Sequence, residues 1–106
     1  MKRDVRIVVI AAMAASMSIP AIAQSAGAST YKSKCAMCHG ADGLGNTPAG
    51  KALKTISFKS PELVKASNAE LIADTKKGKG AMPEYGTKLS DEQIREVIEY
   101  IRTLQK

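Results

Sequence analysis

The two cysteines of the sequence lie in one short motif, Cys35-Ala36-Met37-Cys38-His39. A C-x-x-C-H motif is the attachment signature of c-type haem, in which each thiol adds to a vinyl group and the histidine binds the iron. Because the thiols are three residues apart, a helical turn places them on one side, facing one edge of a flat ring. The motif therefore predicts one covalently bound haem c, with Cys35 and Cys38 forming the thioethers and His39 as an axial iron ligand.

Three other uses of two cysteines compete with haem attachment. An exported chain with an even number of cysteines often carries a structural disulfide, and a C-x-x-C pair can be a thioredoxin-like redox site. The redox site requires a βαβ unit, but no run of alternating β-branched residues predicts a sheet. A structural zinc site requires four ligands, and the chain has only two cysteines and one histidine. Zinc is thereby excluded, and the disulfide and the dithiol remain as alternatives to haem.

Residues 1–23 have the pattern of a secretory signal peptide. Three basic side chains stand near the start, an apolar segment follows over residues 7–19, and residues 21–23 read Ala-Ile-Ala, which is a small-x-small cleavage pattern. The apolar segment is shorter than the roughly 20 residues that span a membrane. We therefore expect cleavage after Ala23, no stable membrane insertion afterwards, and a location in the periplasm, where bacteria attach haem to this motif.

Residues 24–106 form one predicted domain of 83 residues. Removal of the signal peptide takes out three basic residues and one acidic residue, which leaves 13 basic and 9 acidic residues. The lysines are scattered and no aromatic stripe accompanies them, so the charge pattern does not predict nucleic-acid binding. The domain has only four aromatic residues and is close to the lower size limit for an unaided core. A covalently attached haem would add apolar surface to such a core.

The clearest predicted helix covers residues 90–104. Ser90 and Gln93 form a capping-box pattern at its start. Apolar residues then recur at helical spacing, with charged residues between them. The predicted inward face consists of Ile94, Val97, Ile98, Ile101 and Leu104.

Shorter helices and two loops are expected before this helix. Helices are predicted over residues 29–38, from Ser60 with a proline in the next position, and from Ser67 to residue 77. Glycine and proline interrupt residues 40–50 and 81–89, which are therefore expected to be loops. Residues 51–59 show no clean period and are expected to be extended with one turn. The pattern as a whole predicts an all-α domain.

A second axial ligand has to come from outside the motif. A sixth ligand needs a lone pair such as that of His, Met or Lys, and the chain has a single histidine. Among the methionines after the signal peptide, Met37 lies between the two cysteines and cannot reach the opposite face of the ring, which leaves Met82. Met82 stands next to Pro83 in a loop, as suits an arm that brings a sulfur over a plane. A core position for Met82, or ligation by Lys77 or Lys79, remains the alternative.

The domain resembles the class I cytochromes c over nearly its whole length. The resemblance rests on CAMCHGADG at residues 35–43, on GAMP at residues 80–83, and on the helix of residues 90–104. It implies a small cytochrome c fold of three to four helices wrapped around one covalently attached haem. It also implies His39 and Met82 as the two axial ligands of the haem iron.

The resemblance implies two further roles. The carbonyl of Pro48 would accept a hydrogen bond from the second ring nitrogen of His39, which fixes the orientation of the imidazole. The first helix would pack across the last helix through Gly27, Tyr31 and Tyr100.

These features together predict an electron carrier and not an enzyme. With both axial positions filled, the iron has no open site for a substrate, and no constellation of acid, base and nucleophile indicates catalysis. We expect a periplasmic monomer that shuttles single electrons between a redox protein donor and acceptor, which would present acidic docking surfaces to its lysines. These lysines are Lys34, Lys51, Lys54, Lys76, Lys77, Lys79 and Lys88. The alternatives are a haem-binding subunit or module of a larger oxidoreductase complex, and a gas-binding haem protein with an open sixth position.

Overall fold

The computed structural model of the protein describes residues 21–106. Most of the predicted signal peptide lies outside this range, so its cleavage after Ala23 stays a prediction. Six α-helices follow one another in the described part: α1 (Ala21–Lys34), α2 (Ala36–His39), α3 (Pro48–Ala52), α4 (Pro61–Lys65), α5 (Asn68–Lys77) and α6 (Asp91–Leu104). Within residues 21–106 the extended pairing is limited to one bridge, between Lys79 and Met82. The all-α prediction is confirmed.

Four of the expected helices are present, with different boundaries. The helix expected over residues 29–38 begins already at Ala21 and is divided at Cys35 into α1 and α2. The helices α4, α5 and α6 begin after Ser60, Ser67 and Ser90, as expected. Three of the six helices are only four or five residues long, which raises the count above three to four.

Helix α3 lies across the boundary between the expected loop of residues 40–50 and the segment of residues 51–59, which was expected to be extended with one turn. Thr47 is its N-cap, and the Thr47 hydroxyl oxygen accepts a hydrogen bond from the backbone N–H of Gly50 at 2.9 Å. Pro48 occupies the first helical position, where its missing N–H is not needed. A threonine cap followed by proline is thus sufficient to form one helical turn inside a glycine-rich segment.

The start of α6 follows the sequence prediction closely. The Ser90 hydroxyl oxygen accepts a hydrogen bond from the backbone N–H of Gln93 at 3.1 Å, and the Gln93 side chain accepts one from the Ser90 N–H at 2.9 Å. This reciprocal pair is the predicted capping box. Ser67 caps α5 through the Glu70 N–H in the same way, whereas the Ser60 side chain makes no capping bond at α4.

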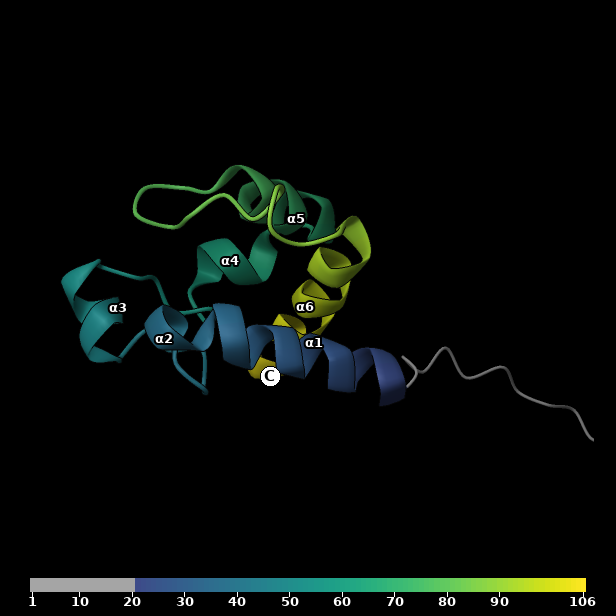
Figure 1. Ribbon diagram of the computed structural model, residues 1–106. Coiled ribbons are helices and arrows are strands. Elements are labelled where there is room, and N and C mark those ends of the chain that lie inside the picture. Colours follow the sequence, from purple (N-terminus) through teal and green to yellow (C-terminus); the bar gives the residue numbers. More distant parts are fainter. Residues whose placement is uncertain (1–20) are drawn as a thin grey trace, which may run out of the picture.

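Helices α1 and α6 cross each other and form the base of the domain (Figure 1). At the crossing, a Cβ added to Gly27 would overlap the backbone carbonyl oxygen of Glu96 and lie 3.2 Å from the Cβ of Tyr100. The rings of Tyr31 and Tyr100 lie beside this contact, with centroids 5.2 Å apart. The packing roles implied for Gly27, Tyr31 and Tyr100 are therefore present in the structure.

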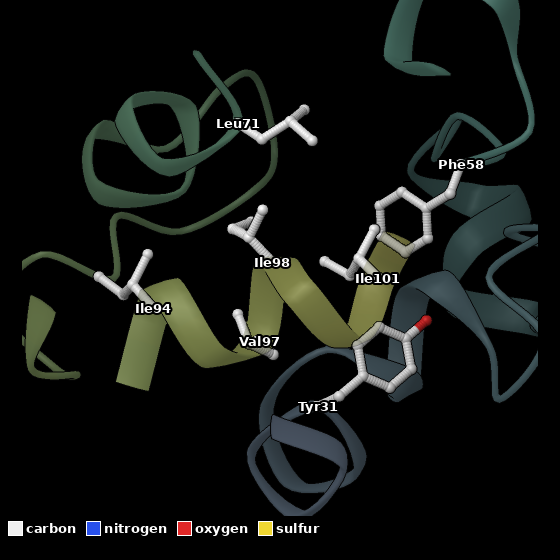
Figure 2. Packing of buried hydrophobic residues seen from close by; sticks show 7 residues of the cluster. All are labelled: Tyr31, Phe58, Leu71, Ile94, Val97, Ile98 and Ile101. Carbon is white, nitrogen blue, oxygen red and sulfur yellow. The ribbon is translucent and has the colours of Figure 1, made fainter. Parts of the chain in front are cut away.

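The core lies between α6 and the elements that surround it. Figure 2 shows Ile98 and Leu71 pointing toward one another from α6 and α5, with Phe58 and Tyr31 near Ile101. The buried cluster consists of Tyr31, Phe58, Leu71, Ile94, Val97, Ile98 and Ile101. Leu104, also expected to face inward, is partly buried against this cluster. None of the helices in residues 21–106 is long and apolar enough to cross a membrane.

A candidate haem-binding cavity

The C-x-x-C-H motif forms a helical turn directly after α1. The backbone N–H of His39 donates to the Cys35 carbonyl at 3.0 Å, and that of Gly40 donates to the Ala36 carbonyl at 2.8 Å. Thr47 also binds this turn, because its hydroxyl donates to the Met37 carbonyl at 2.6 Å. Because α2 is a single turn, both cysteines and the histidine come from one rigid corner of the domain.

A cavity of about 370 Å³ lies next to this corner. It is lined by Cys35, Cys38 and His39 and also by Met82, which comes from the loop between α5 and α6. In Figure 1 that loop extends over the side of the domain where α2 and α3 lie. The cavity thus brings together all four residues that the sequence predicts for the site. The remaining wall is mostly apolar and includes Leu53, Ile56, Phe58, Leu63, Leu71, Val97, Ile98 and Ile101.

The imidazole of His39 is held by stacking. Its ring lies parallel to that of Phe58, with centroids 4.4 Å apart and an interplanar angle of 15°. Burial lowers the pKa of His39 below its usual value, which favours the neutral imidazole that a metal ion binds. Its Nδ1 is buried and has no hydrogen-bond partner within residues 21–106. A buried, neutral imidazole beside an apolar cavity fits the role of an iron ligand.

The hydrogen bond expected between Pro48 and His39 is not formed. Nδ1 of His39 lacks any partner in the described part of the chain, the Pro48 carbonyl included. Pro48 is the first residue of α3, and a helical carbonyl accepts a hydrogen bond from the backbone N–H four residues later in its own helix. The expectation for Pro48 was wrong, and Phe58 is the contact that orients the ring.

The environment of the cysteines differs from that of a redox dithiol. Both thiols are free and half-buried, so no disulfide joins them in the structure. Burial, with a smaller contribution from Cys38, raises the pKa of Cys35 to about 11. Redox-active cysteines need a lowered pKa, because the thiolate is the reactive form. Residues 21–106 also contain no group of three His, Cys, Asp or Glu side chains that could hold a bare metal ion. These features fit a pair of thiols that bind an apolar ring.

Met82 is carried by an arm, residues 78–86, that leaves the end of α5 and returns to it. Lys79 and Met82 exchange two backbone hydrogen bonds of 3.3 and 3.0 Å, which form a tight turn with Gly80 at a positive φ of 60°. Gly78 at the root of the arm has a φ of 73°, and a Cβ there would lie 2.6 Å from the Met82 carbonyl oxygen. We name residues 78–86 the Met82 arm.

The lysines that were expected to form a docking surface do not share one environment. Lys34, Lys54 and Lys79 line the cavity. Lys76 instead forms an ion pair with Asp91 at 2.8 Å. Lys88 lies 5.6 Å from the centre of the Tyr85 ring. The lysines of the cavity are therefore the better candidates for contact with a partner.

Two residues of the site were not found from the sequence. Phe58 stacks on His39 and is the only phenylalanine of the chain, but it lies in a segment without a clear period. Thr47 joins α3 to the motif through hydrogen bonds to the carbonyls of Met37 and Cys38. The Thr-Pro pair at residues 47 and 48 was the signal for a helix cap at this position.

Comparison with protein families gives one match over most of the chain. A model of the family described as cytochrome C oxidase, cbb3-type, subunit III matches residues 23–101. A cytochrome c6 from Leptolyngbya boryana is 35% identical over 79 residues, which cover 73% of this chain and 87% of that protein.

Solved structures of similar fold are also haem proteins of this kind. The KustC0563 c-type cytochrome has a TM-score of 0.69 and 28% identity, covering 76% of this chain and 98% of that one. Cytochrome c6 from the diatom Phaeodactylum tricornutum has a TM-score of 0.59 and 29% identity, covering 77% and 93%. The cofactor is accordingly a covalently bound haem c with its iron. The chain therefore belongs to the class I cytochromes c, the small electron-carrying proteins with a single covalently bound haem.

Proposed function

We propose that this cytochrome c is a one-electron carrier of the periplasm. Cys35 and Cys38 form the thioether bonds to the haem, and His39 and Met82 are its axial ligands. The observation that carries the proposal is that these four side chains line one apolar cavity together. Haem iron supplies the one-electron change, so no residue of the chain has to act as an acid, base or nucleophile.

Each residue of the proposed site has a definite task. Phe58 holds the plane of the His39 ring, and burial keeps that ring neutral and able to bind iron. Thioether ligation by Met82 favours the reduced iron and raises the reduction potential. The apolar wall excludes water from the haem. Exclusion of water also raises the reduction potential, because an apolar environment disfavours the more highly charged oxidised iron.

Met82→Ala is the experiment that tests this proposal. The variant should retain its haem but lose the weak far-red band that sulfur-to-iron ligation gives the oxidised protein. Its reduced form should bind carbon monoxide readily, whereas the reduced wild type should not, because its sixth position is filled. Both changes are read from absorption spectra.

Met37→Ala is the matched control for this experiment. Met37 lies within the motif but is 78% exposed, so its removal should leave both spectra unchanged. If wild type and Met82→Ala have the same spectra in both oxidation states, Met82 only packs in the cavity. Ready binding of carbon monoxide by the reduced wild type would favour a gas-binding protein with an open sixth position.

Docking through basic residues is the second part of the proposal. Lys34, Lys54 and Lys79 line the cavity and outnumber its two acidic residues, Glu62 and Asp74. The lysines would attract an acidic surface on the redox donor or acceptor. Such attraction raises the association rate and is screened beyond about 8 Å at physiological salt. We therefore expect the rate of electron transfer with an acidic redox protein to fall steeply as ionic strength rises.

A pair of charge reversals can test this surface directly. The double variant Lys54→Glu and Lys79→Glu should slow association about tenfold or more at low salt and leave the haem spectrum intact. The control is the double variant Lys32→Glu and Lys65→Glu, which has the same net charge but changes residues outside the cavity wall. Equal slowing in the two double variants would mean that the net charge of the protein, and not the cavity lysines, steers association. A wild-type rate indifferent to salt would mean that docking is apolar.

A second candidate function is a subunit of a larger oxidoreductase complex. The family model that matches residues 23–101 is described as a subunit of a cytochrome oxidase, which favours this alternative. A free carrier should elute from a periplasmic extract at the size of a monomer. A complex would instead carry the haem signal to a much larger size.

A further inference from the structure

The backbone of Tyr85 fixes the returning end of the Met82 arm. Tyr85 follows Met82 by three positions, and its N–H donates to the Thr75 carbonyl at 3.0 Å. The N–H of Gly86 donates to the Lys76 carbonyl at 3.1 Å. These two bonds attach the arm to the last turn of α5, but they do not attach it to the part of the domain that carries the motif.

The side chain of Tyr85 makes the connection to the motif. Its hydroxyl donates to the backbone carbonyl of Lys34 at 2.9 Å, across 51 positions of sequence. Lys34 is the last residue of α1 and immediately precedes Cys35. Among residues 21–106 this is the one hydrogen bond that joins the Met82 arm to α1 or α2. The Tyr85 ring is half-buried and lines the cavity.

We propose that Tyr85 is a positioning residue whose hydroxyl fastens the Met82 arm to the end of α1 and thereby keeps the Met82 sulfur on the haem iron. The inference rests on the proposed function of Met82 as the distal ligand. Cys35 holds the haem next to the carbonyl that Tyr85 binds. The haem and the arm are thus tied to the same point of the backbone, and the bond limits how far the arm can swing away from the ring.

The size of the effect follows from the kind of bond. A neutral hydrogen bond between a hydroxyl and a carbonyl shifts an equilibrium by roughly two- to tenfold. The Lys34 carbonyl is reachable by water when the hydroxyl is removed, because this hydrogen bond is exposed. Loss of the hydroxyl should therefore change the opening of the arm without disturbing the core, since the ring itself remains in place.

The test uses oxidised holoprotein with imidazole as an external ligand. Imidazole can bind the iron only after Met82 has left it, so at high imidazole the binding rate approaches the opening rate of the arm. Loss of the far-red band reports the exchange. In Tyr85→Phe, we expect the limiting rate, the affinity for imidazole, or both to rise about two- to tenfold over the wild type.

Tyr31→Phe is the matched control. The Tyr31 hydroxyl also donates to a backbone carbonyl, that of Gly40, at 2.6 Å, but it does not touch the arm. This variant should lower the denaturant midpoint of unfolding and leave imidazole binding unchanged. A merely structural role for Tyr85 would give the same pattern in Tyr85→Phe.

Three outcomes would contradict the inference, and each of them overturns a different part of the proposal. If imidazole binds Tyr85→Phe at the wild-type rate and affinity while Met82→Ala binds it without an opening step, the role of Tyr85 is overturned and that of Met82 stands. If Tyr31→Phe binds imidazole faster by the same factor, a general loss of stability explains the effect and the positioning role of Tyr85 is overturned. If the wild type behaves like Met82→Ala, the inference and the proposed ligand both fail.

Discussion

Replacing Cys38 by alanine is expected to reduce the yield of haem-containing protein to a small fraction of the wild-type yield. If both proposed thioethers exist, this variant could form only one of them, and the haem would be held less firmly next to the proposed ligand His39. The measurement is the haem that stays with the polypeptide after denaturation in acidic organic solvent, compared at equal expression. Cys35→Ala should behave in the same way.

A large loss of haem-containing protein is expected because the cavity and the core share residues. Leu71, Val97, Ile98 and Ile101 belong to the buried core and also line the cavity. Bound haem would add apolar contacts on the cavity side of these side chains, in a domain that is already near the lower size limit. Incompletely attached chains should therefore unfold readily and be degraded.

The control for the cysteine variants is Met37→Ala. It changes the same motif at an exposed position and should retain the full yield of holoprotein. Haem that stays covalently attached at the wild-type level in Cys38→Ala would show that Cys38 is not a point of attachment. Haem that leaves the wild type freely in acidic solvent would contradict both proposed thioethers.

The second large effect is expected at the crossing of α1 and α6. Gly27→Val should lower the free energy of unfolding of the holoprotein by about 3 kcal/mol, the upper end of the usual range for overpacking. A Cβ at this position overlaps the Glu96 carbonyl, which belongs to the backbone of α6 and cannot turn aside as a side chain can. The helices would have to move apart, which weakens the contact between Tyr31 and Tyr100. Denaturant unfolding followed by circular dichroism measures the change.

Gly27→Ala tests the same contact by the sign of its effect. Alanine is a better helix former than glycine by about 1 kcal/mol, so the substitution would stabilise an isolated or exposed helix. The contact with Glu96 predicts that Gly27→Ala destabilises the protein instead. Ser29→Ala on the exposed part of α1 should change the stability by about 0.5 kcal/mol or less. A Gly27→Ala protein more stable than the wild type would exclude close packing at this crossing.

Local patterns predicted the parts of the fold that depend on neighbouring residues. The capping box of α6 and its buried apolar stripe could be derived from the sequence, because both depend on residues that are three or four positions apart in one helix. The helical turn of the motif could be predicted for the same reason. The two cysteines and His39 are close in the sequence, so the fold has little freedom to separate them.

Contacts between distant residues could not be predicted in this way. The stacking of Phe58 on His39 and the bond from Tyr85 to Lys34 join segments 19 and 51 positions apart. No spacing rule relates such pairs, since the path of the intervening loops decides them. The error at Pro48 has a similar origin, because the Thr47 cap turns this segment into a helix and redirects its carbonyls.

The crossing of α1 and α6 also bears on the order in which the chain folds. Gly27 and Glu96 meet although about 70 positions separate them, where α6 crosses α1 (Figure 1). The chain is synthesised from its N-terminus, so the C-x-x-C-H motif is present long before α6 has been made. Closing so long a loop is slow because of its entropy. The proposed attachment of haem at the motif would therefore not need to wait for folding, whereas the core cannot close until the last helix has been made.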